Sequence, residues 1–359
     1  MPRDAPPDLA ELSLADLEAW IVARGLPRFR ARQIYAWVWK RGATSFDQMS
    51  DLGRDLRAAL AADLVLSTPS VVRQDISEDG TRKLVLGLAD LRQIECVYIP
   101  DTPSQTFCVS TQVGCAMGCA FCLTGKMGLV RHLTAGEIAA QVRVLAGVTG
   151  LLHSAFNIVL MGMGEPLHNY DATMKALALL NEPHGMALPP KRVTLSTVGL
   201  VPMLDKLAVE PLMPNLAISL HATTEEQRLA IVPPSGKYGL RAILDACRRF
   251  PLAKRSRITF EYVMLDGVND TPVDARRLVK LLAGIKAKVN LIPLNAAPGI
   301  PFDRPSDARV NAFARILAGR GMTVSVRKSR GRDIRAACGQ LIVEGGRTKS
   351  AAQALAAAL

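Results

Sequence analysis

The sequence predicts an α/β fold in which a parallel sheet with covering helices follows a small helical domain and a few β-strands. Between residues 105 and 345, short β-branched runs alternate with helical segments, the pattern of a parallel sheet that is open or rolled into a barrel. Residues 9–65 instead repeat apolar side chains every three or four positions, as helices do. From residue 71 the spacing of apolar side chains shortens to the two-residue alternation of β-strands.

Length and composition describe a globular protein. The chain has 359 residues, 49% hydrophobic and 21% charged, enough for two domains or one large domain with an appendage. Glycine and polar residues interrupt its most apolar stretch, residues 146–164, so we expect no membrane-spanning helix. The first eight residues contain acids and prolines and no apolar segment. We therefore expect no signal peptide and a cytoplasmic protein.

The net charge indicates the class of binding partner, and the cysteine content indicates the redox compartment. The net charge of +12 favours a polyanionic partner, although a generally basic proteome would give the same value. Aromatic residues make up 5% of the chain, too few for a platform of many stacked rings. The chain has seven cysteines, three of them in one loop. This pattern differs from a secreted disulfide framework and suits a reducing cytosol.

The first domain is predicted to span residues 1–68 and to be helical. Its first helix begins at Leu14, where Ser13 and Asp16 can form a weak capping box. Two more helices are predicted over residues 30–39 and 54–64. Basic side chains gather in this domain: Arg24, Arg28, Arg30, Arg32, Lys40 and Arg41. They form either a solvated helix face or a surface that grips RNA phosphate.

Residues 69–100 are predicted to form a β-strand extension. The strands are expected at residues 71–76, 83–88 and 93–99, with Asp79-Gly80 as a hairpin turn between the first two. Glu95 lies on the third strand beside Cys96. A lone glutamate on an exposed strand is usually a solvated side chain, and its position alone assigns Glu95 no other role.

The main domain is predicted over residues 101–345. Its strands are expected at residues 105–110, 157–161, 192–196, 215–220, 257–264, 289–293 and 323–326. Helices are expected between them, and one opens at Thr134 with a capping box to Glu137. Residues 346–359 form a C-terminal tail, whose alanine-rich end from residue 351 is either helical or frayed.

The segments of chemical interest follow the ends of these strands. They are the loop after residue 110, the turn Gly162-Met163-Gly164-Glu165-Pro166, Ser196, the run Ser219-Leu220-His221, and Asn295. In barrel enzymes the working residues sit at the carboxyl ends of the strands. The sequence therefore predicts one site at this edge of the sheet.

One loop in this set contains three cysteines, Cys115, Cys119 and Cys122, in the spacing C-x3-C-x2-C. Three thiolates are one short of the usual ligand set of a structural zinc site or an electron-transfer iron–sulfur cluster. A metal site with a missing protein ligand has an open position for chemistry. The alternatives are a zinc loop with a distant fourth ligand, or three unrelated buried cysteines.

Several uncommon strings, taken together, resemble one family. They are Phe107-Cys108-Val109-Ser110-Thr111-Gln112-Val113-Gly114-Cys115, Thr124-Gly125-Lys126-Met127-Gly128, Met161 to Leu167, and Arg327 to Leu341. The family is that of the radical S-adenosylmethionine RNA methyltransferases, which methylate C2 of an adenine in 23S ribosomal RNA and in some cases act on tRNA. The resemblance runs from about Leu14 to Leu341. Leu123 and His132 depart from the family pattern, but neither is at a ligand position.

The resemblance implies a partial (β/α)6 barrel with a [4Fe–4S] cluster held by Cys115, Cys119 and Cys122. It also implies a bound S-adenosyl-L-methionine. The positions that match family contacts to this cofactor are Gly164, Glu165, Ser196, Ser219, Leu220, His221 and Asn295. Without the resemblance, His221 reads as a buried histidine, and the turn at Gly164 as an ordinary strand exit.

The resemblance also implies roles for three residues outside the cysteine loop. Cys338 is expected to accept a methyl group first, Glu95 to remove the C2 proton, and Cys108 to resolve the RNA adduct through a transient disulfide with Cys338. Without the resemblance, Cys108 and Cys338 read as core cysteines, as Cys96 and Cys247 still do. The basic residues between Arg327 and Arg335 either activate the Cys338 thiol or bind phosphate.

The implied partners are 23S rRNA, tRNA in some family members, and an external, flavodoxin-like electron donor, and a monomer is expected. Three other functions stay open. The first is methylation of adenine C8 by the same machinery. The second is a non-catalytic RNA-binding protein with a zinc loop. The third is a radical enzyme acting on a small molecule, which the basic charge and the Cys338 segment disfavour.

Overall fold

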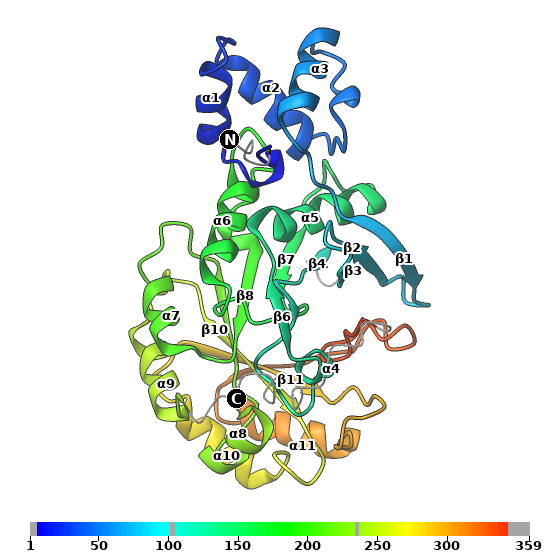
Figure 1. Ribbon diagram of the computed structural model, residues 1–359. Coiled ribbons are helices and arrows are strands. Elements are labelled where there is room, and N and C mark those ends of the chain that lie inside the picture. Colours follow the sequence, from blue (N-terminus) through cyan, green and yellow to red (C-terminus); the bar gives the residue numbers. More distant parts are fainter. Residues whose placement is uncertain (1–5, 101–104, 234–236, 344–359) are drawn as a thin grey trace, which may run out of the picture.

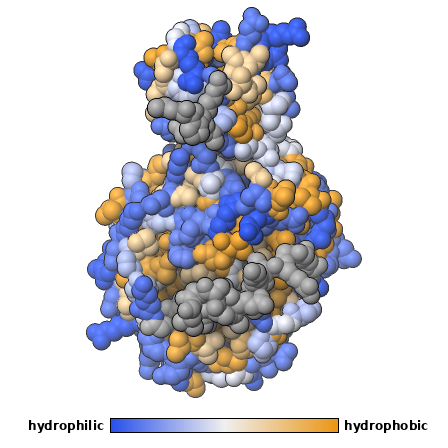
Figure 2. Space-filling model, in the orientation of Figure 1, coloured by the Kyte–Doolittle hydropathy of each residue, from blue (hydrophilic) through white to orange (hydrophobic). Residues whose placement is uncertain are grey.

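The computed structural model describes residues 6–100, 105–233 and 237–343. A small helical lobe stands on a larger α/β body (Figure 1). Figure 2 shows the two lobes in space-filling form, with apolar and hydrophilic residues interspersed over this face. The tail predicted at residues 346–359 lies outside the described residues. None of the helices in the described ranges has the length and apolarity needed to cross a membrane.

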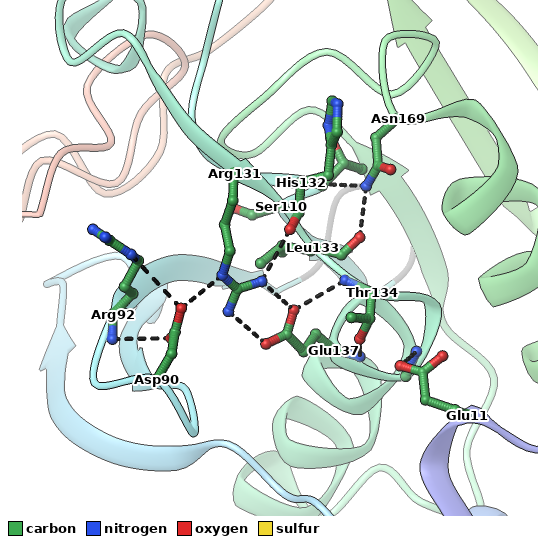
Figure 3. Close-up of polar contacts among 12 residues, drawn as sticks. Glu11, Asp90, Arg92, Ser110, Arg131, His132, Leu133, Thr134, Glu137 and Asn169 are labelled. Carbon is green, nitrogen blue, oxygen red and sulfur yellow. Dashed lines mark hydrogen bonds and ion pairs between the residues drawn. The ribbon is translucent and has the colours of Figure 1, made fainter. Parts of the chain in front are cut away.

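The N-terminal lobe is helical, as predicted. Its elements are the 3-10 helices η1 (Leu9–Glu11) and η2 (Phe46–Gln48) and the α-helices α1 (Leu14–Val22), α2 (Phe29–Trp39) and α3 (Arg54–Asp63). Ser13 and Asp16 form the predicted capping box. The lobe docks on helix α5 (Ala135–Thr149). There Glu11 accepts a hydrogen bond of 2.7 Å from the Gly136 amide (Figure 3), and the buried Arg143 donates to the Ser67 carbonyl at 2.8 Å.

Ten strands form one sheet in the body. Its order is β1 (Ser70–Ile76), β2 (Arg82–Gly87), β3 (Gln93–Ile99), β4 (Thr106–Cys108), β7 (Asn157–Leu160), β8 (Val193–Thr197), β9 (Asn215–Ser219), β10 (Ile258–Met264), β11 (Ala287–Pro293) and β12 (Thr323–Val326). The first four strands pair antiparallel, and every pair from β4 to β12 is parallel. The predicted strands are therefore confirmed, and the extension is continuous with the main sheet.

Helices follow the parallel strands. They are α4 (Leu123–Lys126), α5, α6 (Tyr170–Asn181), α7 (Val201–Leu207), α8 (Glu225–Ile231), α9 (Leu240–Arg249), α10 (Pro272–Leu281) and α11 (Asp307–Ala318), with the 3-10 helix η3 (Pro190–Arg192) before β8. Thr134 and Glu137 cap α5 as predicted. Strands β1 and β12 end the sheet without pairing to each other, so the strand–helix repeats form the expected partial barrel.

A second, two-stranded sheet was not predicted. Strands β5 (Gln112–Gly114) and β6 (Leu129–His132) flank the cysteine loop. They are too short to show a period in the sequence. The pairing requires glycine at position 114, where φ is +76° and a Cβ atom would lie 1.9 Å from the Gly128 carbonyl oxygen.

Ion pairs fix this small sheet to the body (Figure 3). Arg131, on β6, makes contacts of 2.7 Å with both Asp90, between β2 and β3, and Glu137, on α5. The Asn169 side chain donates two 2.8 Å hydrogen bonds, to the carbonyls of Thr111 and Leu133. These contacts hold the end of the hairpin that lies opposite the cysteine loop, and the hairpin strands carry the loop from this anchored end.

Candidate active site

A cavity of about 800 Å³ opens at the carboxyl edge of the parallel strands. Its lining includes residues from the cysteine loop, from the ends of β7, β8 and β9, and from the segment after β12: Cys115, Cys119, Cys122, Gly164, Glu165, Ser196, Ser219, His221 and Cys338. The structure therefore brings most of the predicted site residues into one space. We call it the cofactor cavity.

The cysteine loop is held by backbone hydrogen bonds from three separate segments. The Cys115 amide donates to the Gly128 carbonyl at 2.8 Å, and the Ala120 amide donates to the Ile231 carbonyl, at the end of α8, at 2.9 Å. The Leu123 amide donates to the Gly339 carbonyl at 2.8 Å. These bonds fix the loop on three sides without using a thiol, so the sulfur atoms remain available as ligands.

The donor set of the loop suits a cluster better than a single ion. Across the described residues, no group of three His, Cys, Asp or Glu side chains converges closely enough to hold one metal ion. A [4Fe–4S] cluster takes each thiolate on a different iron, so its ligands stand farther apart. Burial raises the pKa of the Cys115 thiol to about 12, and a metal favours the thiolate that burial disfavours.

Gly164 and Glu165 form a tight turn after β7. Gly164 has φ +102°, and a Cβ atom there would lie 2.6 Å from the Gln112 side chain. The Glu165 carboxylate accepts hydrogen bonds from the amides of Leu167 at 3.0 Å and Val198 at 2.9 Å. Burial raises the pKa of Glu165 to about 7, although the Val198 hydrogen bond opposes this shift. A buried carboxylate at the cavity wall suits an ammonium group.

The ends of β8 and β9 add the next predicted residues. The hydroxyls of Ser196 and Ser219 lie 3.2 Å apart. His221 has φ +59°, and its Nδ1 accepts a 3.0 Å hydrogen bond from the Val263 amide. Burial lowers the pKa of His221 to about 3, so the ring is neutral at pH 7. The ring contacts Phe121 of the cysteine loop edge-on at a centroid distance of 4.8 Å.

Two predicted cofactor contacts lie apart from this lining. Leu220 is fully buried, and its amide donates to the Glu261 carbonyl at 3.0 Å. Asn295 lines a neighbouring cavity, and its side-chain amide donates to the Cys338 carbonyl at 3.2 Å. In the structure, Asn295 therefore supports the Cys338 segment.

This neighbouring cavity contains both outlying cysteines, and we call it the two-cysteine cavity. Cys108 comes from β4 and Cys338 from the segment after β12. Burial raises the pKa of Cys108 to about 12, and Cys338 adds to the shift while Arg327 opposes it. Cys338 and Arg327 line both cavities. Cys338 is half-buried, unlike Cys96 and Cys247, which are core residues as expected.

Glu95 differs from the solvated side chain that its isolated position suggested. It is fully buried, 3.2 Å from the Lys83 ammonium, and it accepts a 2.8 Å hydrogen bond from the Ile342 amide. Val97 pairs directly with Cys108, so Glu95 and Cys108 lie on the same face of the sheet. Glu95 lines neither of the two cavities. Burial raises its pKa, and Lys83 opposes this shift.

Two residues at this edge were missed from the sequence. Glu261 lines the cofactor cavity from β10 and accepts a 2.7 Å hydrogen bond from the Asn290 side chain. A charged residue in a strand that is buried throughout was a usable signal, because such positions are ordinarily apolar. Arg228, on α8, lies behind the strand ends. Its sequence context resembles an ordinary helix surface and gave no signal.

The cysteine loop, the Glu165 turn and the strand-end polar residues define a class. The chain belongs to the radical SAM superfamily, whose family model matches residues 109–279. Residues 7–66 match the model described as the ribosomal RNA large subunit methyltransferase N-terminal domain.

Comparison with curated proteins gives the family within that class. The chain belongs to the family of the dual-specificity RNA methyltransferase RlmN. It is 48% identical to the protein of that name from Syntrophobacter fumaroxidans, over 95% of this chain and 99% of the relative. It is 49% identical to the one from Anaeromyxobacter sp., over 96% of this chain and 93% of the relative. A crystal structure of a radical SAM methyltransferase from Sphaerobacter thermophilus, 47% identical, superposes with a TM-score of 0.90 over 94% of this chain and 99% of that one.

Proposed function

We propose that this protein methylates C2 of an adenine in 23S rRNA, and that it also acts on tRNA. The observation that carries the proposal is the position of Cys338, which lines both the cofactor cavity and the two-cysteine cavity beside Cys108. A thiol at such a junction can receive a group in one cavity and be resolved by a second thiol in the other. The names of the relatives supply the RNA substrate class.

Different residues of the chain would bind the cluster and the separate groups of S-adenosylmethionine. Cys115, Cys119 and Cys122 would hold the [4Fe–4S] cluster, and Glu165 would receive the ammonium group of S-adenosylmethionine. When bound, the cluster supplies the electron for reductive cleavage of this cofactor. Ser196 and Ser219 offer hydroxyls to its polar groups. His221, being neutral, offers hydrogen bonds without adding charge.

The remaining residues would carry the methyl group. Cys338 accepts it by displacement, and the half-buried Arg327 lines both cavities together with it. The radical that reductive cleavage of S-adenosylmethionine would supply takes one hydrogen atom from the Cys338 methyl group, and the carbon then adds to C2 of the adenine. Glu95 removes the C2 proton, and the one electron that is left over would return to the cluster. Burial raises the pKa of Glu95, which makes it a stronger base than an exposed carboxylate. Cys108 then attacks the Cys338 sulfur and breaks its bond to the carbon, which keeps the electron pair and takes up a proton to become the C2 methyl group. The RNA is thereby released, and Cys108 and Cys338 are left as a transient disulfide.

The segment around residue 342 covers Glu95 in this structure. Its role as base therefore includes a movement of that segment, because Glu95 must come within reach of the adenine. An adenine inside folded RNA must also leave its stack, at a cost of a few kcal/mol.

Residues 1–68 are proposed as an RNA-binding domain, residues 69–100 as an extension and residues 101–345 as the catalytic barrel. The arginines of the first domain are exposed and form ion pairs: Arg24 with Asp63 and Arg41 with Asp51, both exposed pairs, and Arg28 and Arg32 with the buried Glu18. The exposed pairs are worth about 0–1 kcal/mol, so phosphate can replace them. We expect RNA affinity to fall steeply between low and physiological salt, and an affinity that stays flat would contradict this role.

The proposed partners also include a flavodoxin-like electron donor, and the proposed state is a cytoplasmic monomer. The test of the whole proposal is anaerobic turnover with 23S rRNA fragments and tRNA, followed by mass spectrometry of the adenines. A methyl group at C2 is the expected product. A methyl group at C8, or a wild-type protein that binds zinc and transfers no methyl group, would contradict the proposal.

A further inference from the structure

Arg228 is buried at the point where the cysteine loop meets two strand ends. Its side chain is among the largest that are fully buried, with 1% of the residue exposed. It donates a 3.1 Å hydrogen bond to the Ser219 carbonyl and further hydrogen bonds to the carbonyls of Leu220 and Val198. A single guanidinium therefore joins the ends of β8 and β9, the two strands that carry Ser196, Ser219 and His221.

Arg228 forms no ion pair with a carboxylate within the described ranges, although the charge of Glu225, at the start of the same helix, also favours its protonated form. None of the ion pairs found there includes Arg228, and its Nε has no hydrogen-bond acceptor. Burial lowers its pKa to about 10, so it still carries its charge at pH 7. Its three carbonyl acceptors satisfy hydrogen bonds but do not neutralise the charge. Burial of a charge without a paired anion costs several kcal/mol, which points to an anion that belongs beside it.

The cysteine loop supplies the position of that anion. Val198 and Ser219, whose carbonyls accept hydrogen bonds from Arg228, line the cofactor cavity together with Cys119. Cys119 also packs against the apolar cluster that contains Ile231, at the end of the Arg228 helix. Helix α8 ends against the loop, because the Ile231 carbonyl accepts the Ala120 amide at 2.9 Å. A [4Fe–4S] cluster on three thiolates has a net charge of about −1 when oxidised and about −2 when reduced. A fixed cation nearby therefore stabilises the reduced form more than the oxidised one.

We propose that Arg228 is the fixed counter-charge of the cluster, which raises the cluster's reduction potential while aligning the two strand ends of the cofactor cavity. Arg228 is a positioning residue, since it reaches cofactor groups through carbonyls and through its field. The inference rests on the proposed role of Cys115, Cys119 and Cys122 as cluster ligands.

The chain contains a matched control for this role. Arg143, on α5, is 2% exposed and also donates to main-chain carbonyls, those of Ala43 and Ser67. Its Nε also lacks an acceptor. It lies at the junction with the N-terminal lobe, where its guanidinium stands 5.6 Å from the Trp39 ring centre. Substituting Arg143 therefore removes a comparable buried cation far from the cysteine loop.

The test is a redox titration of the reconstituted holoenzyme with dithionite, followed by electron paramagnetic resonance. Arg228→Gln and Arg228→Met are expected to lower the equilibrium constant for one-electron reduction about tenfold, a shift of about −59 mV. Arg228→Lys keeps the charge and is expected to retain most of the wild-type potential. Arg143→Gln is expected to leave the potential unchanged.

Each result has one reading. A neutral Arg228 variant that holds four irons at the wild-type potential overturns the proposal, as does an Arg228→Lys variant that falls as far as Arg228→Gln. If both neutral variants lose the cluster while Arg143→Gln keeps it, the counter-charge is required for cluster binding, which supports the proposal. If Arg143→Gln also loses the cluster, the loss reflects impaired folding, and the proposal is overturned. The proposed function is tested separately by the metal content of the wild-type protein. Wild-type protein that lacks about four irons and four sulfides per chain would contradict the proposed function itself.

Discussion

The two cavities of the site are built in different ways. The cofactor cavity takes its three proposed cluster-ligand thiols from eight consecutive residues, Cys115 to Cys122, and backbone hydrogen bonds hold that loop. The two-cysteine cavity takes Cys108 from β4, Asn295 from the segment after β11 and Cys338 from the segment after β12. A local motif thus specifies one cavity, and tertiary folding alone assembles the other. The two should therefore respond differently to substitution.

The largest expected effect is a loss of function in the two-cysteine cavity that leaves the cofactor cavity working. Cys338→Ala removes the proposed methyl carrier but leaves the cysteine loop and the Glu165 turn intact. We expect RNA methylation to be lost entirely, while iron content and reductive cleavage of S-adenosylmethionine persist. Mass spectrometry of the RNA and chromatography of the cleaved cofactor measure the two activities. Methylation that survives the substitution would show that another group carries the methyl.

The next effect concerns only the two-cysteine cavity. Cys108→Ala leaves Cys338 without the thiol that would resolve the adduct, so we expect at most one turnover per chain and a covalent protein–RNA species. Denaturing gel electrophoresis with labelled RNA detects this species, and nuclease treatment should remove it. The matched control is Cys247→Ala, a core cysteine on α9 outside both cavities. An adduct in the control but not in Cys108→Ala would assign the resolving step elsewhere.

The contrast between the cavities also explains what the sequence could reveal. The spacing of Cys115, Cys119 and Cys122 predicts a metal site because all three ligands share one loop. Cys108 and Cys338 each resemble core cysteines, and family resemblance alone singled them out. Their common cavity depends on the pairing of β4 with β7 and on the path of the chain after β12.

Burial by a distant segment explains why the position of Glu95 on its strand did not reveal that its side chain is buried. The spacing of apolar side chains in residues 93–99 predicts a strand that contains Glu95, and the structure confirms this strand. The segment around Ile342 then covers it, through a contact that spans 247 residues of sequence. No local pattern encodes such a contact. The fold was more predictable, because the ten strands of the main sheet and the helix caps at Ser13 and Thr134 are local features.

A third prediction concerns the cofactor cavity and the pH dependence of the free energy of unfolding. Glu165 has a folded-state pKa of about 7 against an ordinary value of 4.5, so the folded chain binds the proton more tightly than the unfolded chain. In protein freed of cofactors, stability should therefore fall as pH rises from 4.5 to about 7, by about 1–3 kcal/mol. Glu165→Gln should lose this part of the slope, which urea unfolding at several pH values measures. An unchanged slope would mean that Glu165 is not protonated in this window.

The smallest expected effect lies at the link between the cavities. Thr124 lines the cofactor cavity, and its hydroxyl donates a 2.6 Å hydrogen bond to the carbonyl of Leu341, which lines the two-cysteine cavity. Thr124→Val keeps the shape of the side chain but leaves that buried carbonyl without this donor. We expect a loss of about 1–3 kcal/mol in the free energy of unfolding.

The same substitution should act on the Cys338 segment more than on the cysteine loop. The loop keeps its backbone hydrogen bonds to Gly128 and Ile231 and loses only the contact of the Thr124 hydroxyl with the Cys122 thiol. The segment loses one of its ties to α4. We therefore expect faster alkylation of Cys338 in Thr124→Val at unchanged iron content, measured by mass spectrometry of the labelled peptide. Thr149→Val, which removes a 2.7 Å hydrogen bond to Leu145 within α5, is the control for stability alone. Equal alkylation rates in the two variants would mean that the cavities are not coupled through this hydrogen bond.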